Sequence, residues 1–368
     1  MSRLDELIKE LCPDGVEHHK LNDVCDINKG VQLNKADMAD EGTYPVINGG
    51  VNPSGFIEQY NQEANTITIS QGGASAGYVN WLDTPFWAGA HCYVVTPNET
   101  VLNRYLFHFI KSKESELQEC QYGAGIPALN KKTVAILSIP VPPIEIQEEI
   151  VKTLDKFTNY VTELTAELTA RRTQFEYYRN KLVYSDGYEL VDINDISKLS
   201  AGGDAPKTHM SKEKNEQYTI PIYSNGIAEN ALYGYTDEAK VNVPCITLAA
   251  RGTIGWAALR KEPFYPIIRL ICLIPNNEHD IRYIKYAIDT LEFHVPDGGI
   301  PQLTVPMLKK YKLPIHSKEK ESEIADVLDK FSKLCDDISE GLPAEIEARQ
   351  KQYDYYRDKL LSFKEKEN

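Results

Sequence analysis

The stretch Leu154-Asp155-Lys156-Phe157 returns later in the chain as Leu328-Asp329-Lys330-Phe331. Likewise, Glu176-Tyr177-Tyr178-Arg179-Asn180-Lys181-Leu182 returns as Asp354-Tyr355-Tyr356-Arg357-Asp358-Lys359-Leu360. Between the two stretches of each copy, seam residues recur about every 3.5 residues. This spacing is typical of a helix packed lengthwise on a partner helix. In the first copy this seam consists of Leu154, Phe157, Val161, Leu164, Leu168, Arg171, Phe175, Tyr178 and Leu182. The sequence therefore predicts two matched helices of about 40 residues, each about 60 Å long, that pack on each other.

The second copy of the seam carries an insertion. It is formed by Leu328, Phe331, Cys335, Ile338, Leu342, Ile346, Arg349, Tyr353, Tyr356 and Leu360, with one extra step of four before Ile346. Such an insertion locally unwinds a coiled coil but leaves its seam on the interface. It falls at Glu340-Gly341-Leu342-Pro343, where glycine and proline also favour a bend or a break.

Each seam contains an arginine, Arg171 in the first copy and Arg349 in the second. Two interpretations are open. The side chain can extend its aliphatic stem over the edge of the seam and keep its charge in water, which is the favoured interpretation. Alternatively, each arginine pairs with acids on the opposite helix and fixes the register.

The repeat extends beyond the helices into the rest of the chain. Matched segments are Asp14-Gly15-Val16-Glu17 with Asp186-Gly187-Tyr188-Glu189, Pro45-Val46-Ile47-Asn48-Gly49 with Pro221-Ile222-Tyr223-Ser224-Asn225, and Gly125-Ile126-Pro127-x-Leu129 with Gly299-Ile300-Pro301-x-Leu303. The chain is therefore a duplication, made of two domains and not of a solenoid. We expect the domains at residues 1–141 and 185–315, and their helices at 142–184 and 316–368.

Short apolar runs bounded by glycine, proline or asparagine predict strands inside the domains. They are Thr66–Ser70, Cys92–Val95, Cys245–Leu248 and Leu270–Ile274. Helical spacing follows at Asn103–Ile110 and Ile281–Ile288. The predicted fold class is α+β, with loop-rich domains.

The composition is that of an ordinary globular protein, because 42% of the 368 residues are hydrophobic and 26% are charged. The net charge of −14 argues against a general polyanion binder, although local faces can still bind DNA. The seven scattered cysteines include no Cys-x-x-Cys pair, so neither a zinc ribbon nor a disulfide framework is indicated. The sequence contains no apolar stretch long enough to span a membrane, and its first residues suggest a short amphipathic helix. We therefore expect a cytoplasmic protein.

Two segments imitate catalytic motifs. Gly73-Ala74-Ser75-Ala76-Gly77 fits Gly-x-Ser-x-Gly, but a nucleophile elbow needs a helix directly after it, and Tyr78-Val79-Asn80-Trp81 suggests a strand. Its counterpart Gly252-Thr253-Ile254-Gly255 has no serine. Gly123-Ala124-Gly125-Ile126-Pro127-Ala128 fits Gly-x-Gly-x-x-Ala, but it lacks the preceding strand of a dinucleotide site. We interpret both segments as loops.

Metal-binding residues are equally sparse. His18-His19 and His91-Cys92 could each supply two ligands, but no third and fourth ligands stand at a suitable spacing. The sequence predicts neither a metal site nor catalytic residues.

The doubled order of a domain and a long helix, with the quoted helix repeats and the Gly-Ile-Pro-x-Leu boundaries, resembles the specificity subunit of type I restriction-modification enzymes over essentially the whole chain. The resemblance implies two target-recognition domains joined by two antiparallel coiled-coil helices. Each domain would read one half of a split double-stranded DNA sequence. The helices would set the spacing and dock two methyltransferase subunits, and two motor-nuclease subunits would complete the complex.

The same resemblance implies that this chain is not itself catalytic and needs no cofactor. S-adenosylmethionine would belong to the methyltransferase partner, and ATP and Mg to the motor-nuclease partner. The acidic total departs from a free-standing DNA binder, and it fits a chain whose partners grip most of the DNA.

Positions that differ within the shared frame are candidates for reading DNA bases. When the two halves are aligned, Gln71 and Gly72 correspond to Ala250 and Arg251, and His91 corresponds to Arg269. Arginine can pair bidentately with guanine, and glutamine with adenine. The matched Lys35 and Lys207 are phosphate-contact candidates, which position the protein without specifying sequence. Each of these residues could instead be an ordinary solvated loop residue.

The tyrosine pairs Tyr177-Tyr178 and Tyr355-Tyr356 are candidates for docking the methyltransferase, since tyrosine is enriched at interfaces. The alternative is that they fill the seam between the helices. Two other function classes stay open: a protein-protein scaffold for non-nucleic partners, and, against the evidence of the repeat, a hydrolase built on Ser75.

Overall fold

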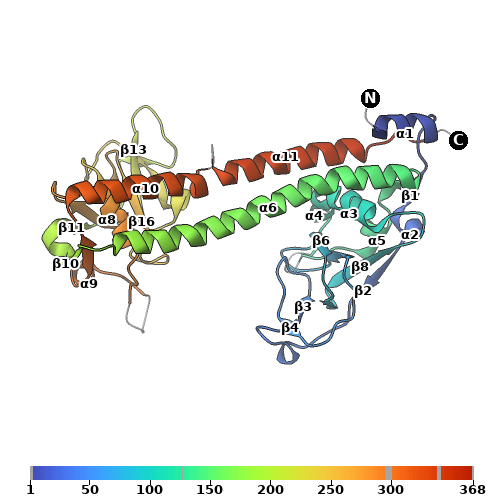
Figure 1. Ribbon diagram of the computed structural model, residues 1–368, viewed down its shortest axis with the longest axis horizontal. Coiled ribbons are helices and arrows are strands. Elements are labelled where there is room, and N and C mark those ends of the chain that lie inside the picture. The colour runs from blue at the N-terminus through green and yellow to red at the C-terminus, as the bar shows by residue number, and fades with distance from the viewer. Residues whose placement is uncertain (1–2, 124, 126, 295–300, 338–340, 367–368) are drawn as a thin grey trace. The chain divides into compact units, whose positions relative to one another are not determined.

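The computed structural model describes residues 3–123, 125, 127–294, 301–337 and 341–366. It contains two compact units (Figure 1). The first unit comprises residues 1–165 and 345–368, and the second comprises residues 166–344. Each unit combines strands with helices, so the predicted α+β class and the duplication are confirmed.

The main sheet of the first unit has the strand order β2-β8-β5-β6 and is antiparallel throughout. Ile67 and Ile69 on the central strand are fully buried, as the short apolar run predicted. The strands are β2 (Cys25–Lys29), β5 (Thr66–Ser70), β6 (Val79–Leu82) and β8 (Cys92–Pro97). Helix α3 (Asn103–Ser112) contributes six consecutive buried residues to the same core.

The second unit repeats this sheet with the order β11-β18-β15-β16, again antiparallel. Its strands are β11 (Ser197–Ala201), β15 (Cys245–Leu248), β16 (Ala257–Arg260) and β18 (Ile271–Pro275). Helix α8 (Ile281–Ile288) takes the place of α3. The two main sheets therefore have the same topology.

Smaller sheets complete each unit. The first unit has the order β4-β3-β7 and the pair β1-β9; the second has β12-β14-β13-β17 and the pair β10-β19. In the first unit the bounds are β1 (His18–Lys20), β3 (Tyr44–Ile47), β4 (Phe56–Ile57), β7 (Trp87–Ala88) and β9 (Ser138–Pro140). In the second they are β10 (Glu189–Asp192), β12 (Met210–Ser211), β13 (Ile220–Tyr223), β14 (Leu232–Thr236), β17 (Tyr265–Pro266) and β19 (Lys312–Ile315).

Short helices connect these strands. They are α1 (Arg3–Leu11), α2 (Leu21–Val24), α4 (Glu114–Glu119), α5 (Lys131–Ala135), α7 (Ile193–Ile196), α9 (Val305–Leu308), η1 (Lys35–Asp37) and η2 (Ala228–Ala231). The expected N-terminal helix is α1.

Helix α6 (Ile144–Val183) is one unbroken helix of 40 residues, as predicted for the first copy (Figure 1). The second copy is divided into α10 (Lys318–Asp336) and α11 (Leu342–Leu360). Gly341 lies at this interruption, where a β-carbon would stand 2.7 Å from the carbonyl oxygen of Asp337. The expected break is therefore present, although residues 338–340, including Glu340 of the insertion, lie outside the described residues.

The long helices contribute to the core of each unit. In the first unit, Ile146, Ile150 and Leu154 of α6 pack in one cluster with Tyr353 of α11. In the second unit, Val183 of α6 packs with α10 residues including Leu328. Each core therefore needs the beginning of one long helix and the end of the other.

The seam prediction was wrong at Tyr178, which is exposed; the neighbouring Arg179 is more sheltered. The matched Tyr356 is also exposed, but its ring stacks on Phe157 of α6, as the seam predicts. A helix turns by about 3.6 residues, so a strict 3.5-residue pattern drifts off the packed face along its length.

The seam arginines pair with their own helices. Arg171 bonds to Glu167 and Gln174, and Arg349 bonds to Glu345 and Gln352. In the second unit the ion pair between the helices is made by Arg172, whose Nη2 lies 3.4 Å from Asp336 Oδ1. Among the described residues, neither Arg171 nor Arg349 pairs with an acid of the opposite helix.

The segment after α1 pairs with the segment after α11 in the first unit. The Val16 backbone N–H donates to Lys364 O at 2.9 Å, and the Lys366 N–H donates to Val16 O at 3.1 Å. This makes a parallel bridge between Val16 and Glu365, which closes the fold of the first unit.

Candidate nucleic-acid interface

Four loops of the first unit converge beside its main sheet. The Gln71 N–H donates to His91 O at 2.8 Å, and the Leu129 N–H donates to Gln71 O at 2.7 Å. Asn48 Oδ1 accepts from the His91 N–H at 3.3 Å, and Ser70 Oγ donates to the carbonyl of Gly49. The structure therefore brings the predicted readers Gln71 and His91 into one loop cluster.

The second unit builds the same cluster from its matched loops. The Leu303 N–H donates to Ala250 O at 2.9 Å, as Leu129 does to Gln71. Asn225 joins the other two loops, since its Oδ1 accepts from the Ala250 N–H at 2.7 Å and its Nδ2 donates to Ile268 O at 2.7 Å. Arg251 and Arg269 directly follow Ala250 and Ile268, and both are exposed. These two predicted readers also belong to one cluster.

The turn that carries Arg269 is strained. Ile268 and Arg269 have φ angles of 51° and 62°, a region that side-chain-bearing residues, and β-branched ones above all, rarely adopt. The Ile268 N–H donates to Gly203 O at 2.9 Å and the Arg269 N–H to Gly202 O at 3.2 Å. These bonds hold the turn in place, and such strain is concentrated at functional sites.

The sequence interpretation missed Gln302. Its Oε1 accepts from Arg251 Nε at 3.1 Å and from Arg251 Nη2 at 2.6 Å, so it holds the planar guanidinium in one orientation. In the first unit the matched residue is Ala128, which bridges to Gly72 as Gln302 bridges to Arg251. The sequence could have indicated Gln302, because it is the residue x that differs between the two copies of Gly-Ile-Pro-x-Leu.

Lys35 and Lys207 are exposed, and each follows a matched glycine. The Gly30 N–H donates to Cys92 O at 3.0 Å, and the Gly202 N–H donates to Leu270 O at 2.8 Å. Lys35 begins η1, and Lys207 lies in a turn. The two lysines thus share a frame, but no described side-chain hydrogen bond links either of them to the converging loops.

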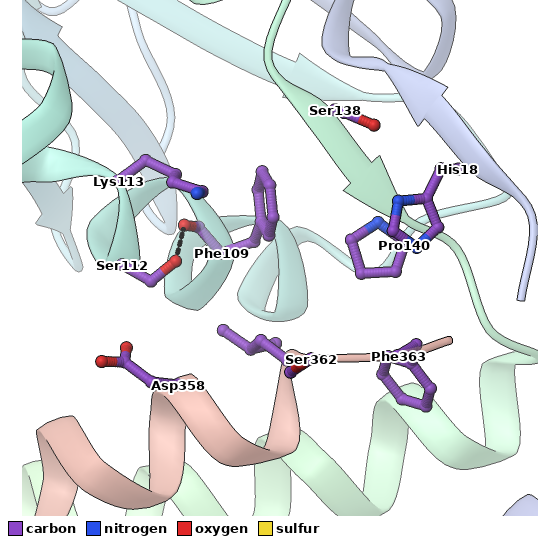
Figure 2. A pocket seen from close by; sticks show the side chains of 10 residues that line it. His18, Phe109, Ser112, Lys113, Ser138, Pro140, Asp358, Ser362 and Phe363 are labelled. Atoms are coloured by element: carbon purple, nitrogen blue, oxygen red, sulfur yellow. Dashed lines mark hydrogen bonds between the residues drawn. The ribbon is translucent and has the colours of Figure 1, made fainter. Parts of the chain in front are cut away.

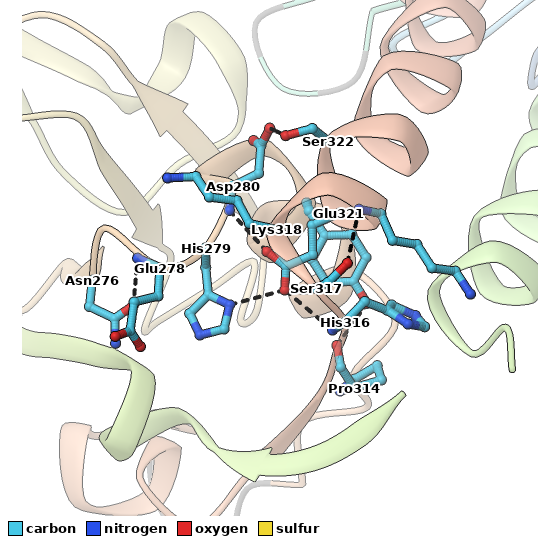
Figure 3. Close-up of polar contacts among 12 residues, drawn as sticks. Asn276, Glu278, His279, Asp280, Pro314, His316, Ser317, Lys318, Glu321 and Ser322 are labelled. Atoms are coloured by element: carbon cyan, nitrogen blue, oxygen red, sulfur yellow. Dashed lines mark hydrogen bonds and ion pairs between the residues drawn. The ribbon is translucent and has the colours of Figure 1, made fainter. Parts of the chain in front are cut away.

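A buried side chain at the start of each long helix fixes the domain to it. Gln147 of α6 accepts from the Leu102 N–H at 2.8 Å. Its counterpart Glu321 of α10 accepts from the Asp280 N–H at 2.9 Å and contacts His279 Nδ1 at 3.0 Å (Figure 3). Both side chains are fully buried. Because each bond is made just before α3 or α8, it fixes the position of that helix on the long helix.

A second matched contact lies further along. Arg104 Nε is 2.7 Å from Asp155 Oδ1, and Arg282 Nη1 is 3.0 Å from Asp329 Oδ2. Burial raises and hydrogen bonds from His108 and Arg104 lower the pKa of Asp155; the lowering prevails, so its carboxylate stays ionised. These ion pairs, together with the buried bonds of Gln147 and Glu321, hold the domains that carry the loops. They are not part of the loop clusters.

The four candidate docking tyrosines lie on the long helices, and the two pairs have the same geometry. Ring centroids are 5.3 Å apart at 77° in both Tyr177–Tyr178 and Tyr355–Tyr356. Tyr177 and Tyr355 are 60% and 61% exposed. Tyr356 also stacks on Phe157, at 5.2 Å between centroids, so one of the four does pack on the other helix.

The segment Gly73–Gly77, which fits the Gly-x-Ser-x-Gly motif, forms a turn. Strand β6, and no helix, follows Gly77, and Gly73 and Gly77 both have positive φ angles. Within the described parts of the chain, no three His, Cys, Asp or Glu side chains are placed to hold a metal. No helix in those parts is both long and apolar enough to cross a membrane.

Comparison with known proteins decides between the open function classes. The sequence profile of the type I restriction modification DNA specificity domain matches residues 13–171 and again residues 185–348. The EcoR124I/EcoR124II specificity subunit of Escherichia coli is 31% identical, over 99% of this chain and 97% of its own length. The chain belongs to the family of type I restriction-modification specificity subunits.

Other relatives agree. A Mycoplasma pneumoniae protein described as a type I specificity subunit is 32% identical over 95% of this chain and 98% of its own. The crystal structure of an S subunit from Mycoplasma genitalium has the same fold, with a TM-score of 0.61, 20% identity, and coverage of 94% of this chain and 96% of that one.

As a specificity subunit the chain recognises DNA within a type I complex and is not catalytic. Its two matched domains fit a target in two parts, and the hydrolase interpretation of Ser75 is set aside. In a specificity subunit, the loop cluster beside each main sheet is the candidate surface for reading DNA bases.

Proposed function

We propose that residues 1–141 and 185–315 are the two target-recognition domains, and that each reads one half of an asymmetric double-stranded DNA target through its loop cluster. One observation carries this proposal. The two clusters share the backbone bond from Leu129 to Gln71 and from Leu303 to Ala250, while the side chains at the surface differ. A shared frame with different side chains is what two readers of different sequences need.

The helices 142–184 and 316–368 would set the spacing between the half-sites and dock two methyltransferase subunits. The identical geometry of the two exposed tyrosine pairs supports one kind of partner bound twice. Two motor-nuclease subunits would complete a restricting complex. S-adenosylmethionine, ATP and Mg would enter with these partners, and the assembly would act in the cytoplasm, where its DNA and partners lie.

A domain exchange tests the proposal. Residues 14–138 are replaced by the corresponding segment of another specificity subunit, and methylated adenines are mapped across the genome. We expect one half-site to change while the other half-site is retained. A change in both half-sites together would overturn the assignment of one reader to each domain.

The competing scaffold interpretation makes a different prediction. A scaffold for non-nucleic partners would show no salt-dependent DNA binding even when its partners are present, whereas neutralised phosphates make binding salt-dependent. Titration of the assembled complex with duplex DNA at several salt concentrations distinguishes the two.

A further inference from the structure

A cavity of about 380 Å³ lies in the first unit, between the end of α3, the end of α11 and the β1–β9 pair (Figure 2). Its volume falls in the range of about 300–1,000 Å³ that is usual for ligand pockets. Phe109 and Phe363 supply apolar walls, and Ser112, Ser362 and His18 supply polar atoms.

The second half of the chain shows what this place can hold. Ser362 stands in the position of Tyr184, since each follows the matched tyrosine pair by the same number of residues. Ser112 likewise matches Thr290, because Ser112 follows Tyr105 by as many residues as Thr290 follows Tyr283. In the second unit the hydroxyl oxygens of Tyr184 and Thr290 are hydrogen-bonded at 3.4 Å. A tyrosine that is 42% exposed therefore lies at this position in the second unit, where the first unit has a serine.

The remaining geometry of the two places agrees. Ser112 Oγ donates to Phe109 O at 2.7 Å, and Thr290 Oγ1 donates to Ala287 O at 2.8 Å. Because the serine proton is committed to that carbonyl, its oxygen is left to accept a bond from a ligand hydroxyl.

His18 supplies a second, independent indication. Its Nε2 is buried without a hydrogen-bond partner among the described residues. His18 pairs with Pro140 across the β-ladder, as Leu190 pairs with Pro314 in the second unit. This ladder position therefore carries an imidazole beside the cavity in the first unit and a leucine in the second. A buried polar atom without a partner costs free energy, and a phenol hydroxyl can both donate and accept.

We propose that this cavity is the docking site for a tyrosine side chain of a partner polypeptide bound along α11. The inference rests on the proposed function, because the partner that binds this helix there is the methyltransferase subunit. Asp358 of α11 lines the cavity, and Tyr355, less than one turn away on the same helix, is a candidate docking residue. The partner's tyrosine would lie in the first unit at the position that Tyr184 holds in the second.

The site is tested with p-cresol, which is the side chain of tyrosine, on the full-length chain. We expect saturable binding to the natural protein, observed by NMR or by a rise in Tm. Toluene, which lacks the hydroxyl, should bind at least tenfold more weakly. In Ser362→Tyr the introduced ring fills the cavity, so p-cresol binding should be lost, whereas Ser362→Ala should retain it.

Either no saturable binding of p-cresol, or equal binding to Ser362→Tyr, would overturn the site. If Ser362→Tyr does not fold, Ser112→Leu obstructs the cavity from its opposite wall and removes the accepting hydroxyl, and the same loss is expected.

The origin of the tyrosine is tested by co-purification with the methyltransferase subunit. Ser362→Tyr should weaken assembly at least tenfold, and Ser362→Ala should not. A Ser362→Tyr variant that assembles like the natural protein would overturn the partner's tyrosine. Failure of the natural protein itself to assemble would instead count against the proposed function.

Discussion

Asp155 and Asp329 hold the same place in the two halves, and each binds the arginine of the domain helix packed against it, Arg104 or Arg282. Their remaining partners differ. Asp155 Oδ1 is bonded to His108 Nε2 at 2.9 Å, whereas Asp329 Oδ1 accepts from the Tyr286 hydroxyl at 2.7 Å. The duplication has kept the carboxylate and the arginine and has changed the third group.

This difference predicts unequal costs for removing the two carboxylates. Asp155→Ala leaves Nε2 of the fully buried His108 without its acceptor, and we expect a loss of about 1–3 kcal/mol in the free energy of unfolding. Asp329→Ala should cost less, because Arg282 keeps Asp280 and Asp326, each at 2.7 Å. Urea denaturation of the full chain measures both, with Asp155→Asn as a control that retains one acceptor. A larger loss for Asp329→Ala would contradict this ranking.

The histidine also predicts a pH dependence. Burial, and secondarily the charge of Arg104, lower the pKa of His108 below its ordinary 6.5, against the opposing effect of Asp155. The unfolded chain therefore binds a proton near pH 6.5 that the folded chain does not, so stability falls as the pH drops below that value. In His108→Tyr, which copies Tyr286, the denaturation midpoint should vary less between pH 8 and 5. An unchanged slope would show that another group is responsible.

Arg251 and Gln302 should act together in reading the second half-site. Arg251→Ala should reduce discrimination there by about 1–3 kcal/mol per lost base contact, and Gln302→Ala should cause a smaller loss because the guanidinium is no longer oriented. Arg269→Ala should affect the same half-site. Arg251→Lys is the matched control, since it keeps the charge and loses the planar fork.

Binding of the assembled complex to duplexes randomised in one half-site measures these effects. Gln71→Ala and His91→Ala should alter only the first half-site. Loss of discrimination in the first half-site on changing Arg251 would refute the assignment.

Lys35 and Lys207 should contribute to DNA affinity without selecting sequence. Lys35→Ala and Lys207→Ala should each weaken binding to all duplexes alike and reduce the slope of log K against log salt concentration by about 1. Lys152→Ala on α6 controls for the loss of one charge. A changed base preference with an unchanged slope would make these lysines readers instead of phosphate contacts.

The tyrosine pairs should be selective for partner docking. Tyr177→Ala and Tyr355→Ala should weaken methyltransferase co-purification, by about 2 kcal/mol if they are hot spots, and leave Tm nearly unchanged, because both rings are mostly exposed. Tyr178→Ala should resemble them. Tyr356→Ala should also lower Tm, because that ring stacks on Phe157. If all four lower Tm equally and leave docking intact, they serve the seam only.

The sequence predicted the elements that depend on local periodicity and repetition. Strands β5 and β15 and helix α8 have the predicted bounds, and the break near Gly341 follows from residues that disfavour a helix. It could not place Tyr178, because a repeat of three and four residues does not show how far the packed face rotates along a long helix.

The loop clusters were predictable only in part. Comparison of the halves identified Gln71, His91, Arg251 and Arg269, because duplication separates shared frame from variable surface. Gln302 was missed, since its role depends on a long-range bridge to Arg251. The strain at Ile268 and Arg269 was likewise invisible, because bonds to Gly202 and Gly203 impose it from another part of the chain.

The bridge between Val16 and Glu365 has a consequence for synthesis on the ribosome. The second unit is one continuous segment, and its core can close while translation of the remaining residues continues. The first unit is begun earlier but needs Tyr353 and Leu361 to complete its core. The domain that emerges first therefore reaches its final packing last, and until α11 and Leu361 have been synthesised, its exposed apolar face is available to chaperones.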